Sequence, residues 1–453
     1  MLTLFKMTGR KRKINRSGGL PDSAEVVILG AGLTGLIAAR ELLRSGARDV
    51  LLLERGPRPG GLLKTDRSAG VTIDELPHVF FTRNKRAAAI FREMAGPVYS
   101  YRHRLGVMWK GGYVDFPFQD NIHQLGLEDR KTALRGLLEA RFKSVPAGPR
   151  NLEELAVREL GGGITDLFFR PYNEKLWQTP LAGMDHKWLA AKIRLPGAAG
   201  LADSILGGRR AGRGDAAPHA EFVYPKRGGI ESLVEGLLGS LKPAAPVCGA
   251  EVLKIDARRK TVLTSRGEVG YGRLISTLPL DRAVRLAGLK ECSGPASRLR
   301  ATRVLCLQYV LSGVNLPPYH WIYVPDPAAP FYRLTRADLI NPGAAPGGHA
   351  LLVECALPPG GANRAAAGLA PRVTAGLVKL GVIRKKDIKT LRAYDHFPAY
   401  PVPHAGHGED VPFCLRRLEE AGIISAGRFG EWAIYNMDHS IEAGISAAEK
   451  TLS

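Results

Sequence analysis

The sequence lacks the features that mark membrane, secreted or metal-binding proteins. No stretch approaches the roughly 18–20 consecutive apolar residues that a membrane-spanning helix needs, so we expect no integral membrane segment. The five cysteines are odd in number and far apart, without the Cys or His spacing of a metal site or a disulfide framework. We therefore predict no metal, free thiols and a cytoplasmic protein.

Acidic residues are also scarce relative to basic ones. Asp and Glu number 43 against 64 Lys and Arg, which leaves a formal net charge of +21. The basic residues are scattered and lack the interleaved aromatics of a single-strand binder, so no nucleic acid partner is expected. The surplus instead favours attraction of small anions. Residues 1–23 carry a basic cluster without an apolar signal segment, and we expect a disordered extension there.

A glycine-rich motif, Gly30-Ala31-Gly32-Leu33-Thr34-Gly35, follows the first predicted strand (residues 24–29) and opens a predicted helix (residues 33–44). The glycines let the backbone approach a pyrophosphate, which would lie at the helix N-terminus where amide groups and the helix dipole favour anions. Glu54 ends the next predicted strand, where a carboxylate accepts hydrogen bonds from ribose hydroxyls. These features predict a βαβ unit that binds a dinucleotide.

Two further glycine turns favour FAD over NAD as the dinucleotide. The first, at residues 55–62, resembles the flavoprotein signature in which the backbone continues along the pyrophosphate toward the flavin. The second, at residues 427–430, precedes a predicted helix whose N-terminus would meet the flavin end of the cofactor. The segment 274–279 is similar to the strand behind FAD in amine-oxidase-like flavoproteins. The cofactor-binding residues predicted in this way are Gly30, Gly32, Leu33, Thr34, Gly35, Glu54, Arg55, Gly60, Gly61, Leu62, Gly427, Arg428, Asn436, Met437, Asp438 and Ser440.

Five segments resemble the UDP-galactopyranose mutases, a family within the amine-oxidase- and protoporphyrinogen-oxidase-like FAD flavoproteins. They are Asp74–Thr82, Tyr113–Asn121, Phe169–Trp177, Pro330–Arg333 and Gly427–His439, in the family's order. The resemblance implies an enzyme that interconverts the pyranose and furanose forms of a UDP-sugar without net oxidation, through attack of reduced flavin N5 on the anomeric carbon. It implies FAD that is active in its reduced form, a UDP-sugar substrate, and NAD(P)H as a candidate reductant.

The same resemblance assigns roles on the substrate side. Arg170 and Arg333 match the family's diphosphate clamps, and guanidinium groups suit a pyrophosphate because they bind it in a bidentate way. His78 falls where the family places a histidine beside the flavin, and it completes the predicted catalytic set. The predicted substrate-binding residues are Tyr323, Tyr400, Tyr435, Asn173 and Trp177.

One position departs from the family's pattern. A tyrosine that contacts the diphosphate is usual shortly after the Gly-Arg-Phe-Gly motif, and Ile434 stands in its place. Either Tyr435, one step later, supplies the contact through a local shift of the backbone, or the contact is absent. The departure leaves open a relative that binds another nucleotide sugar or performs a different reaction.

Two other functions compete with the mutase hypothesis. One is an FAD-dependent oxidoreductase of the amine-oxidase or protoporphyrinogen-oxidase class, and the other is a flavoprotein whose substrate site has only a binding role. Arg170 and Arg333 discriminate, because an apolar tetrapyrrole or an amine has little use for two guanidinium groups at the flavin. The sequence is compatible with a homo-oligomer.

The predicted fold class is α/β, with a Rossmann-type FAD-binding domain, an inserted helical subdomain and an antiparallel-sheet substrate domain. Helical periodicity runs from Glu128 to Leu206, and short strands dominate from Arg300 to Tyr400. The predicted boundaries are 24–95 plus 221–285 plus 420–453 for the FAD-binding domain, 122–206 for the helical subdomain, and 96–121 plus 286–405 for the substrate domain.

Overall fold

The computed structural model describes residues 19–142, 148–187, 196–207, 221–242, 244–358 and 363–453. The first 18 residues of the predicted N-terminal extension therefore lie outside the described part of the chain. Among the residues described, no helix combines the length and the apolar character needed to cross a membrane.

The first sheet carries the nucleotide-binding crossover. Its strands β1 and β2 run parallel and are joined by helix α1, which confirms the predicted βαβ unit. Strand β11 lies parallel to β1 on the other side and also pairs with β17, while β10 and β9 extend the sheet antiparallel. The bounds are β1 Ser23–Leu29, α1 Leu33–Arg44, β2 Val50–Leu53, β9 Val252–Asp256, β10 Thr261–Thr264, β11 Gly267–Ser276 and β17 Ile423–Ser425.

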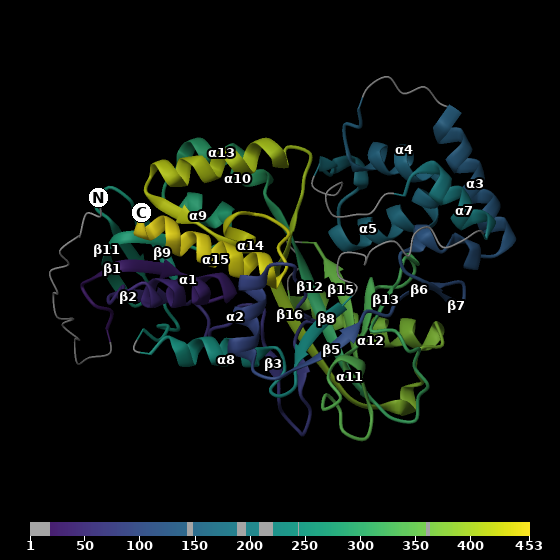
Figure 1. The fold of residues 1–453 in the computed structure, drawn as a ribbon, viewed down its shortest axis with the longest axis horizontal. Helices are drawn as coiled ribbons and strands as arrows, with labels where there is room; N and C mark the ends of the chain where they lie inside the picture. The colour runs from purple at the N-terminus through teal and green to yellow at the C-terminus, as the bar shows by residue number, and fades with distance from the viewer. Residues whose placement is uncertain (1–18, 143–147, 188–195, 208–220, 243, 359–362) are drawn as a thin grey trace.

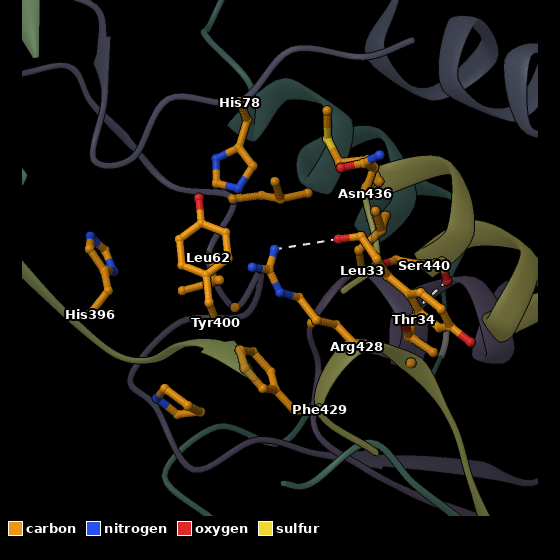
Figure 2. A pocket seen from close by; sticks show the side chains of 18 of the residues that line it. Leu33, Thr34, Leu62, His78, His396, Tyr400, Arg428, Phe429, Asn436 and Ser440 are labelled. Carbon is orange, nitrogen blue, oxygen red and sulfur yellow. Dashed lines mark hydrogen bonds between the residues drawn. The ribbon is translucent and has the colours of Figure 1, made fainter. Parts of the chain in front are cut away.

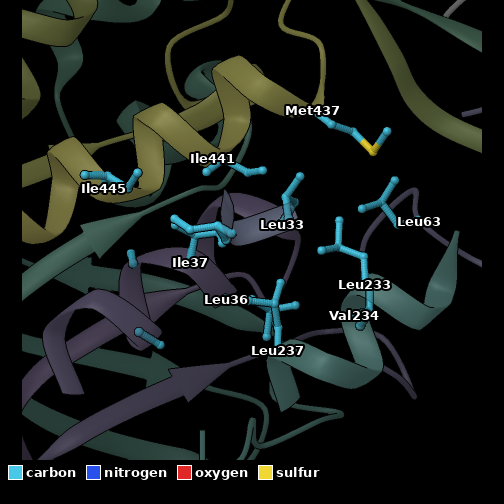
Figure 3. Close-up of a cluster of buried hydrophobic side chains, with 14 of the residues drawn as sticks. Leu33, Leu36, Ile37, Leu63, Leu233, Val234, Leu237, Met437, Ile441 and Ile445 are labelled. Atoms are coloured by element: carbon cyan, nitrogen blue, oxygen red, sulfur yellow. The ribbon is translucent and has the colours of Figure 1, made fainter. Parts of the chain in front are cut away.

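Helices α1 and α15 lie against each other over this sheet, with α8 beside α1 (Figure 3). Their apolar residues, among them Leu36, Ile37 and Ile441, are fully buried in one cluster. A Cβ on Gly444 would lie 2.7 Å from the Thr34 oxygen, so glycine is needed where the two helices touch. The close contact brings the N-termini of both helices to one side of the domain. The bounds are α2 Lys85–Ala95, α8 Glu231–Ser240, α9 Leu280–Leu286, α10 Ser293–Arg298, α13 His407–Glu420, α14 Gly427–Gly430 and α15 Met437–Leu452.

A second sheet of seven strands, in the order β16-β12-β15-β14-β13-β6-β7, lies in the middle of the molecule (Figure 1). Its pairs are antiparallel, as predicted, except that β13 and β6 run parallel. Strand β5 was expected in this domain but pairs with β8 in a separate ribbon, and helix α12 interrupts the predicted run of strands. The bounds are β5 Val98–Arg102, β6 Leu105–Trp109, β7 Gly112–Asp115, β8 Glu221–Pro225, β12 Arg300–Leu311, β13 Trp321–Tyr323, β14 Arg333–Arg336, α11 Ala337–Ile340, β15 His349–Leu357, α12 Asn363–Lys379 and β16 Ile388–Val402.

A helical subdomain lies on the far side of this sheet from the nucleotide-binding domain (Figure 1). It has its own apolar core, and its helices α3 and α4 touch at glycines: a Cβ on Gly136 would lie 2.1 Å from the Gly163 nitrogen. A π-helical turn, Thr165–Phe169, leads directly into α5. The bounds are α3 Leu127–Phe142, α4 Leu152–Ile164, α5 Arg170–Trp177 and α7 Ala198–Leu206.

Candidate functional site

A cavity of about 470 Å³ lies where the two sheets meet. Its lining comes from the start of α1, the loops 54–64 and 77–81, strands β13, β14 and β16, and the segment 426–440. Segments far apart in the sequence thus share one site (Figure 2). The side chains that Figure 2 labels all belong to the lining of this cavity.

The glycines of the first turn have distinct roles. Gly30 has φ +98°, and a Cβ on Gly35 would lie 2.0 Å from the Gly30 carbonyl oxygen, so both are required by the turn itself. Gly32 lines the cavity, and a Cβ there would meet nothing closer than the Gly61 Cα at 4.0 Å. The space in front of Gly32 is therefore free for a ligand, as a pyrophosphate needs.

Two helix N-termini open on the cavity. Gly32 caps α1 and Asn436 caps α15, and neither helix has a side-chain hydrogen bond at its cap. The two helices are joined there by a hydrogen bond from Thr34 Oγ1 to the Ser440 carbonyl oxygen, 3.1 Å long. Unpaired amide groups and the helix dipole at such ends favour a phosphate or a polar heterocycle edge.

Glu54 lines the same cavity at the end of β2. Its carboxylate accepts hydrogen bonds from the backbone nitrogens of Ala31 (2.9 Å) and Gly56 (2.7 Å). These bonds hold the two glycine turns together and fix the carboxylate beside the site. The remaining lone pairs are available to a ribose hydroxyl, as the sequence predicts.

Arg428 is a half-buried cation with few partners. Its guanidinium stacks over the Tyr400 ring, 4.5 Å from the centroid, and Nη1 lies 3.4 Å from the Tyr435 carbonyl oxygen. The Tyr400 hydroxyl also interacts with the guanidinium. Within the described part of the chain no carboxylate forms an ion pair with it, and its buried Nε has no hydrogen-bond partner. Burial lowers its pKa. An anionic or carbonyl-bearing ligand in the cavity would supply the missing partner.

Arg333 faces the cavity from the start of β14 and is held from behind. Its Nε and Nη2 bond both oxygens of Glu354, at 2.5 and 2.7 Å, and Glu354 is only 1% exposed. Tyr332 also donates to Glu354, and the Trp321 ring lies over the guanidinium at 5.2 Å. The remaining guanidinium edge is thereby aimed at the cavity, which includes Arg333 in its lining.

The flavin-side histidine of the sequence prediction also lines the cavity. Burial lowers the pKa of His78 to about 3, so the ring is neutral at physiological pH. Its Nδ1 lies 2.9 Å from the Leu76 carbonyl oxygen and therefore carries the proton. Nε2 is then left as a hydrogen-bond acceptor.

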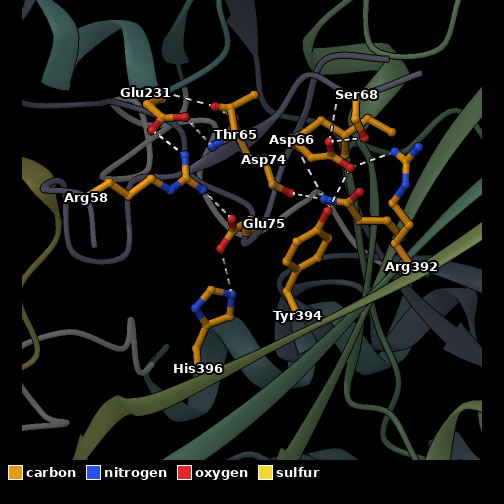
Figure 4. Close-up of polar contacts among 12 residues, drawn as sticks. Arg58, Thr65, Asp66, Ser68, Asp74, Glu75, Glu231, Arg392, Tyr394 and His396 are labelled. Atoms are coloured by element: carbon orange, nitrogen blue, oxygen red, sulfur yellow. Dashed lines mark hydrogen bonds and ion pairs between the residues drawn. The ribbon is translucent and has the colours of Figure 1, made fainter. Parts of the chain in front are cut away.

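Strand β16 is bound to the nucleotide-binding domain by alternate side chains (Figure 4). Arg392 and Tyr394 both bond Asp66, at 2.6 and 2.7 Å, and His396 Nε2 lies 3.9 Å from a Glu75 oxygen. His396 also lines the cavity, and no described residue forms a hydrogen bond with its Nε2. These three side chains fix the position of β16, and therefore of Tyr400, beside the predicted cofactor site.

The buried histidines predict a measurable acid sensitivity. Burial holds the pKa of His78 at about 3 and that of His396 at about 4, below the unfolded value of 6.5. As pH falls below about 6.5, these histidines take up protons in the unfolded chain but not in the folded one. For each such histidine the free energy of unfolding therefore falls by about 1.4 kcal/mol for every unit of pH. Between pH 7 and 5, His396→Leu should lose about 2 kcal/mol less than wild type in urea unfolding. The difference between the two proteins is free of the contributions of other titrating groups, such as Asp74, whose pKa burial raises to about 7. An equal loss of unfolding free energy in the wild type and in His396→Leu would contradict the prediction.

The structure brings Tyr400, Tyr435 and Ile434 to the cavity. Tyr435 stacks on His439, with ring centroids 5.5 Å apart, and its hydroxyl interacts with Glu431. Its hydroxyl is thus engaged elsewhere, and Ile434 presents an apolar surface where the family's tyrosine is usual.

Other predicted substrate residues lie outside this lining. Arg170 is bound by Glu153 at 2.7 Å and Asp166 at 3.0 Å, on the helical subdomain. Asn173 donates to the Phe169 carbonyl oxygen within the helix. Trp177 reaches the site indirectly, with its ring 5.9 Å from that of Tyr400.

Two predicted residues lie close to the cavity behind its lining. Tyr323 is the cross-strand partner of Arg333, and burial raises its pKa to about 12. Asp438 turns to its neighbour His439, with 2.9 Å from the Asp438 oxygen to the His439 nitrogen. Gly30 and Gly35 shape the turn and the other predicted cofactor residues line the cavity.

Sequence reasoning missed Trp321, His396 and Glu354. Side chains two apart on a strand share a face, so Trp321 could have been inferred from Tyr323. His396 lies four residues before Tyr400 across a register shift in β16, so simple alternation does not predict it. No local signal marks Glu354, because its role comes from the register that places it opposite Arg333 on β15.

Comparison with known proteins agrees with the motifs. The profile of the family described as flavin-containing amine oxidoreductase matches residues 33–450. A probable UDP-galactopyranose mutase of Klebsiella pneumoniae is 27% identical over 183 residues, which are 39% of this chain and 46% of that protein. The match thus spans less than half of that relative's length.

Solved structures extend the likeness over nearly the whole chain. Reduced UDP-galactopyranose mutase superimposes with a TM-score of 0.88 at 28% identity, covering 95% of this chain and 96% of that one. A putative protoporphyrinogen oxidase from Exiguobacterium sp. 255-15 has a TM-score of 0.74 at 18% identity, covering 94% and 98%, and shares the fold. The resemblance inferred from the sequence and the predicted fold class are confirmed.

Proposed function

Because the chain belongs to the flavin-containing amine oxidoreductase family, we propose that it is an FAD-dependent UDP-sugar mutase of the UDP-galactopyranose/UDP-galactofuranose type. The observation that carries the proposal is the arrangement of Arg333, aimed at the cavity by Glu354 beneath the Trp321 ring. The likeness to UDP-galactopyranose mutases supports it.

The cavity's polar atoms support a hydroxylated, anionic substrate. Trp321 Nε1 and His396 Nε2 are buried and have no hydrogen-bond partner among the residues that the structure describes, and both residues line the site. An unpaired buried polar group costs about 1–3 kcal/mol, so a ligand that pairs these atoms is favoured over an apolar one. Sugar hydroxyls and phosphate oxygens do so, whereas an apolar tetrapyrrole leaves the atoms unpaired. The uncompensated charge of Arg428 also disfavours an amine.

The residues divide between cofactor and substrate. The glycine turns, Glu54 and the two helix N-termini fit FAD, with the free space before Gly32 receiving its pyrophosphate. Bound reduced FAD supplies the nucleophile for the anomeric carbon. His78 offers a neutral acceptor beside it. Arg333 and Tyr400 hold the substrate diphosphate in line, so the sugar meets the cofactor in one orientation.

Arg170 is proposed as a second diphosphate ligand that must first leave Glu153 and Asp166. Glu153→Gln should then strengthen UDP binding, because it releases Arg170, and Arg170→Ala should weaken it about tenfold, the scale of one charge-assisted hydrogen bond. Titration calorimetry with UDP measures both. Unchanged affinity in the two variants would remove Arg170 from the site, and the argument from Arg333 would stand alone.

The function is tested by incubating dithionite-reduced protein with UDP-galactofuranose and separating the products by chromatography. We expect UDP-galactopyranose, no stoichiometric consumption of reductant, and no turnover by the oxidised protein. NAD(P)H should replace dithionite if it is the reductant. If the oxidised protein turns over an amine or tetrapyrrole and releases one hydrogen peroxide per product, the oxidoreductase alternative is correct and the mutase proposal is wrong.

A further inference from the structure

Lys175, on helix α5, is a lysine whose partners are all backbone carbonyls. Its Nζ donates to the carbonyl oxygens of Val324 (2.9 Å), Asp326 and Phe331 (3.2 Å). An ammonium group has three protons, and the three carbonyls use all of them. Within the described part of the chain these carbonyls are its only hydrogen-bond partners.

These carbonyls belong to the loop that joins β13 to β14. Val324 follows the last residue of β13, and Phe331 lies two residues before Arg333, which begins β14. Tyr323 and Arg333 are cross-strand partners, and the Val324 nitrogen donates to the Tyr332 oxygen at 2.8 Å. Lys175 therefore closes the hairpin that carries two cavity-lining residues, Trp321 and Arg333, and Tyr323, which lies behind the lining.

Helix α5 contacts the site a second time, through its last residue. The Trp177 ring packs edge-to-face with that of Tyr400, which lines the cavity. The helix begins at Arg170, the proposed second diphosphate ligand. One short helix thus touches both the β13–β14 hairpin and the β16 wall.

Removal of an ammonium group from water without a contacting carboxylate is unfavourable, which distinguishes Lys175 from a surface lysine, although Asp326 attracts it from a distance. Desolvation lowers its pKa to about 8. A methionine of similar length would fill the same space without that cost. The retained amine indicates that its three directed hydrogen bonds matter more than packing alone.

We propose that Lys175 is a positioning residue that sets the distance between the α5 helix and the hairpin bearing Arg333, and so preorganises the nucleotide diphosphate site. The inference rests on the proposed function for the identity of the ligand. The link between α5 and the hairpin is independent of it.

The test compares Lys175→Met with Lys110→Met, which removes an exposed lysine paired with Asp129. Lys175→Met should raise the Kd for UDP about tenfold, as expected for lost charge-assisted hydrogen bonds, and leave FAD content unchanged. Backbone hydrogen exchange over residues 321–334 should quicken about tenfold, because the loop loses its fixed donor. Lys110→Met should alter neither quantity.

The outcomes separate the hypotheses. A lowered thermal stability with unchanged Kd and unchanged hairpin exchange would show that Lys175 is merely structural and would overturn the proposal. If Lys175→Met does not fold, Lys175→Arg replaces it: this variant keeps the charge but changes the donor geometry, so Kd for UDP should rise above the wild-type value by less than tenfold and exchange over residues 321–334 should quicken, and wild-type values of both would overturn the proposal. If the wild-type protein does not bind UDP, the proposed function fails, while the exchange measurement still decides whether Lys175 holds the hairpin.

Discussion

Arg333→Ala is expected to lower kcat/KM for UDP-galactofuranose. The loss of transition-state stabilisation should be about 2–4 kcal/mol, close to the effect of removing one preorganised donor in other active sites. Arg333 is aimed by Glu354 and covered by Trp321, so the geometry is present before substrate binds. Lysine at this position should recover only part of the loss, because a point charge does not reproduce the planar fork.

The same substitution should also destabilise the fold. It leaves Glu354 buried without its counter-ion, and breaking such a pair costs about 3–5 kcal/mol of unfolding free energy. The double variant Arg333→Met with Glu354→Gln removes both charges and should regain much of the stability while staying inactive. Denaturant unfolding beside steady-state kinetics separates the two effects. An Arg333→Ala protein with wild-type kcat/KM would contradict the proposed role.

Gly32→Ala should yield a folded protein that has lost its flavin. Backbone φ at Gly32 is −75°, which alanine adopts freely, and the nearest atom to the added methyl is 4.0 Å away. The methyl instead occupies the space proposed for the cofactor's pyrophosphate, where overpacking costs about 1–3 kcal/mol or more. The measurements are the visible absorbance of the purified protein and its affinity for added FAD.

Two other glycines provide matched controls for this experiment. In Gly35→Ala the new methyl would lie 2.0 Å from the Gly30 oxygen, so that variant should fail to fold. Gly239, on α8, has open space around it, and Gly239→Ala should retain both fold and flavin. Normal FAD binding by Gly32→Ala would show that the pyrophosphate lies elsewhere.

The cofactor half of the site was predictable because its signals are local. Gly30 to Gly35 form a turn between one strand and one helix, and Glu54 ends the next strand, so a short stretch of sequence specifies the geometry. The glycine turn at Gly427 needs φ +85°, which again is a property of that residue.

The substrate half was predictable in its residue types and less so in their partners. Motif resemblance named Arg333 and Tyr400, and both line the cavity. It also named Arg170, whose ion pairs with Glu153 and Asp166 depend on how α5 follows the π-helical turn. Glu354 carries no motif, since only the pairing of β14 with β15 makes it the partner of Arg333.

The sequence by itself determined the flavoprotein family and the nucleotide-binding crossover, because glycine spacing and hydrophobic periodicity act over a few residues. The tertiary structure decided which guanidinium groups have a carboxylate to balance their charge. Strand register gives Arg333 a buried carboxylate, whereas Arg428 has an aromatic face and a carbonyl. It also placed Lys175 beneath the hairpin that bears Arg333, a contact between segments about 150 residues apart that no local pattern encodes. Burial and long-range pairing set these partners, and both exist only once the chain has folded.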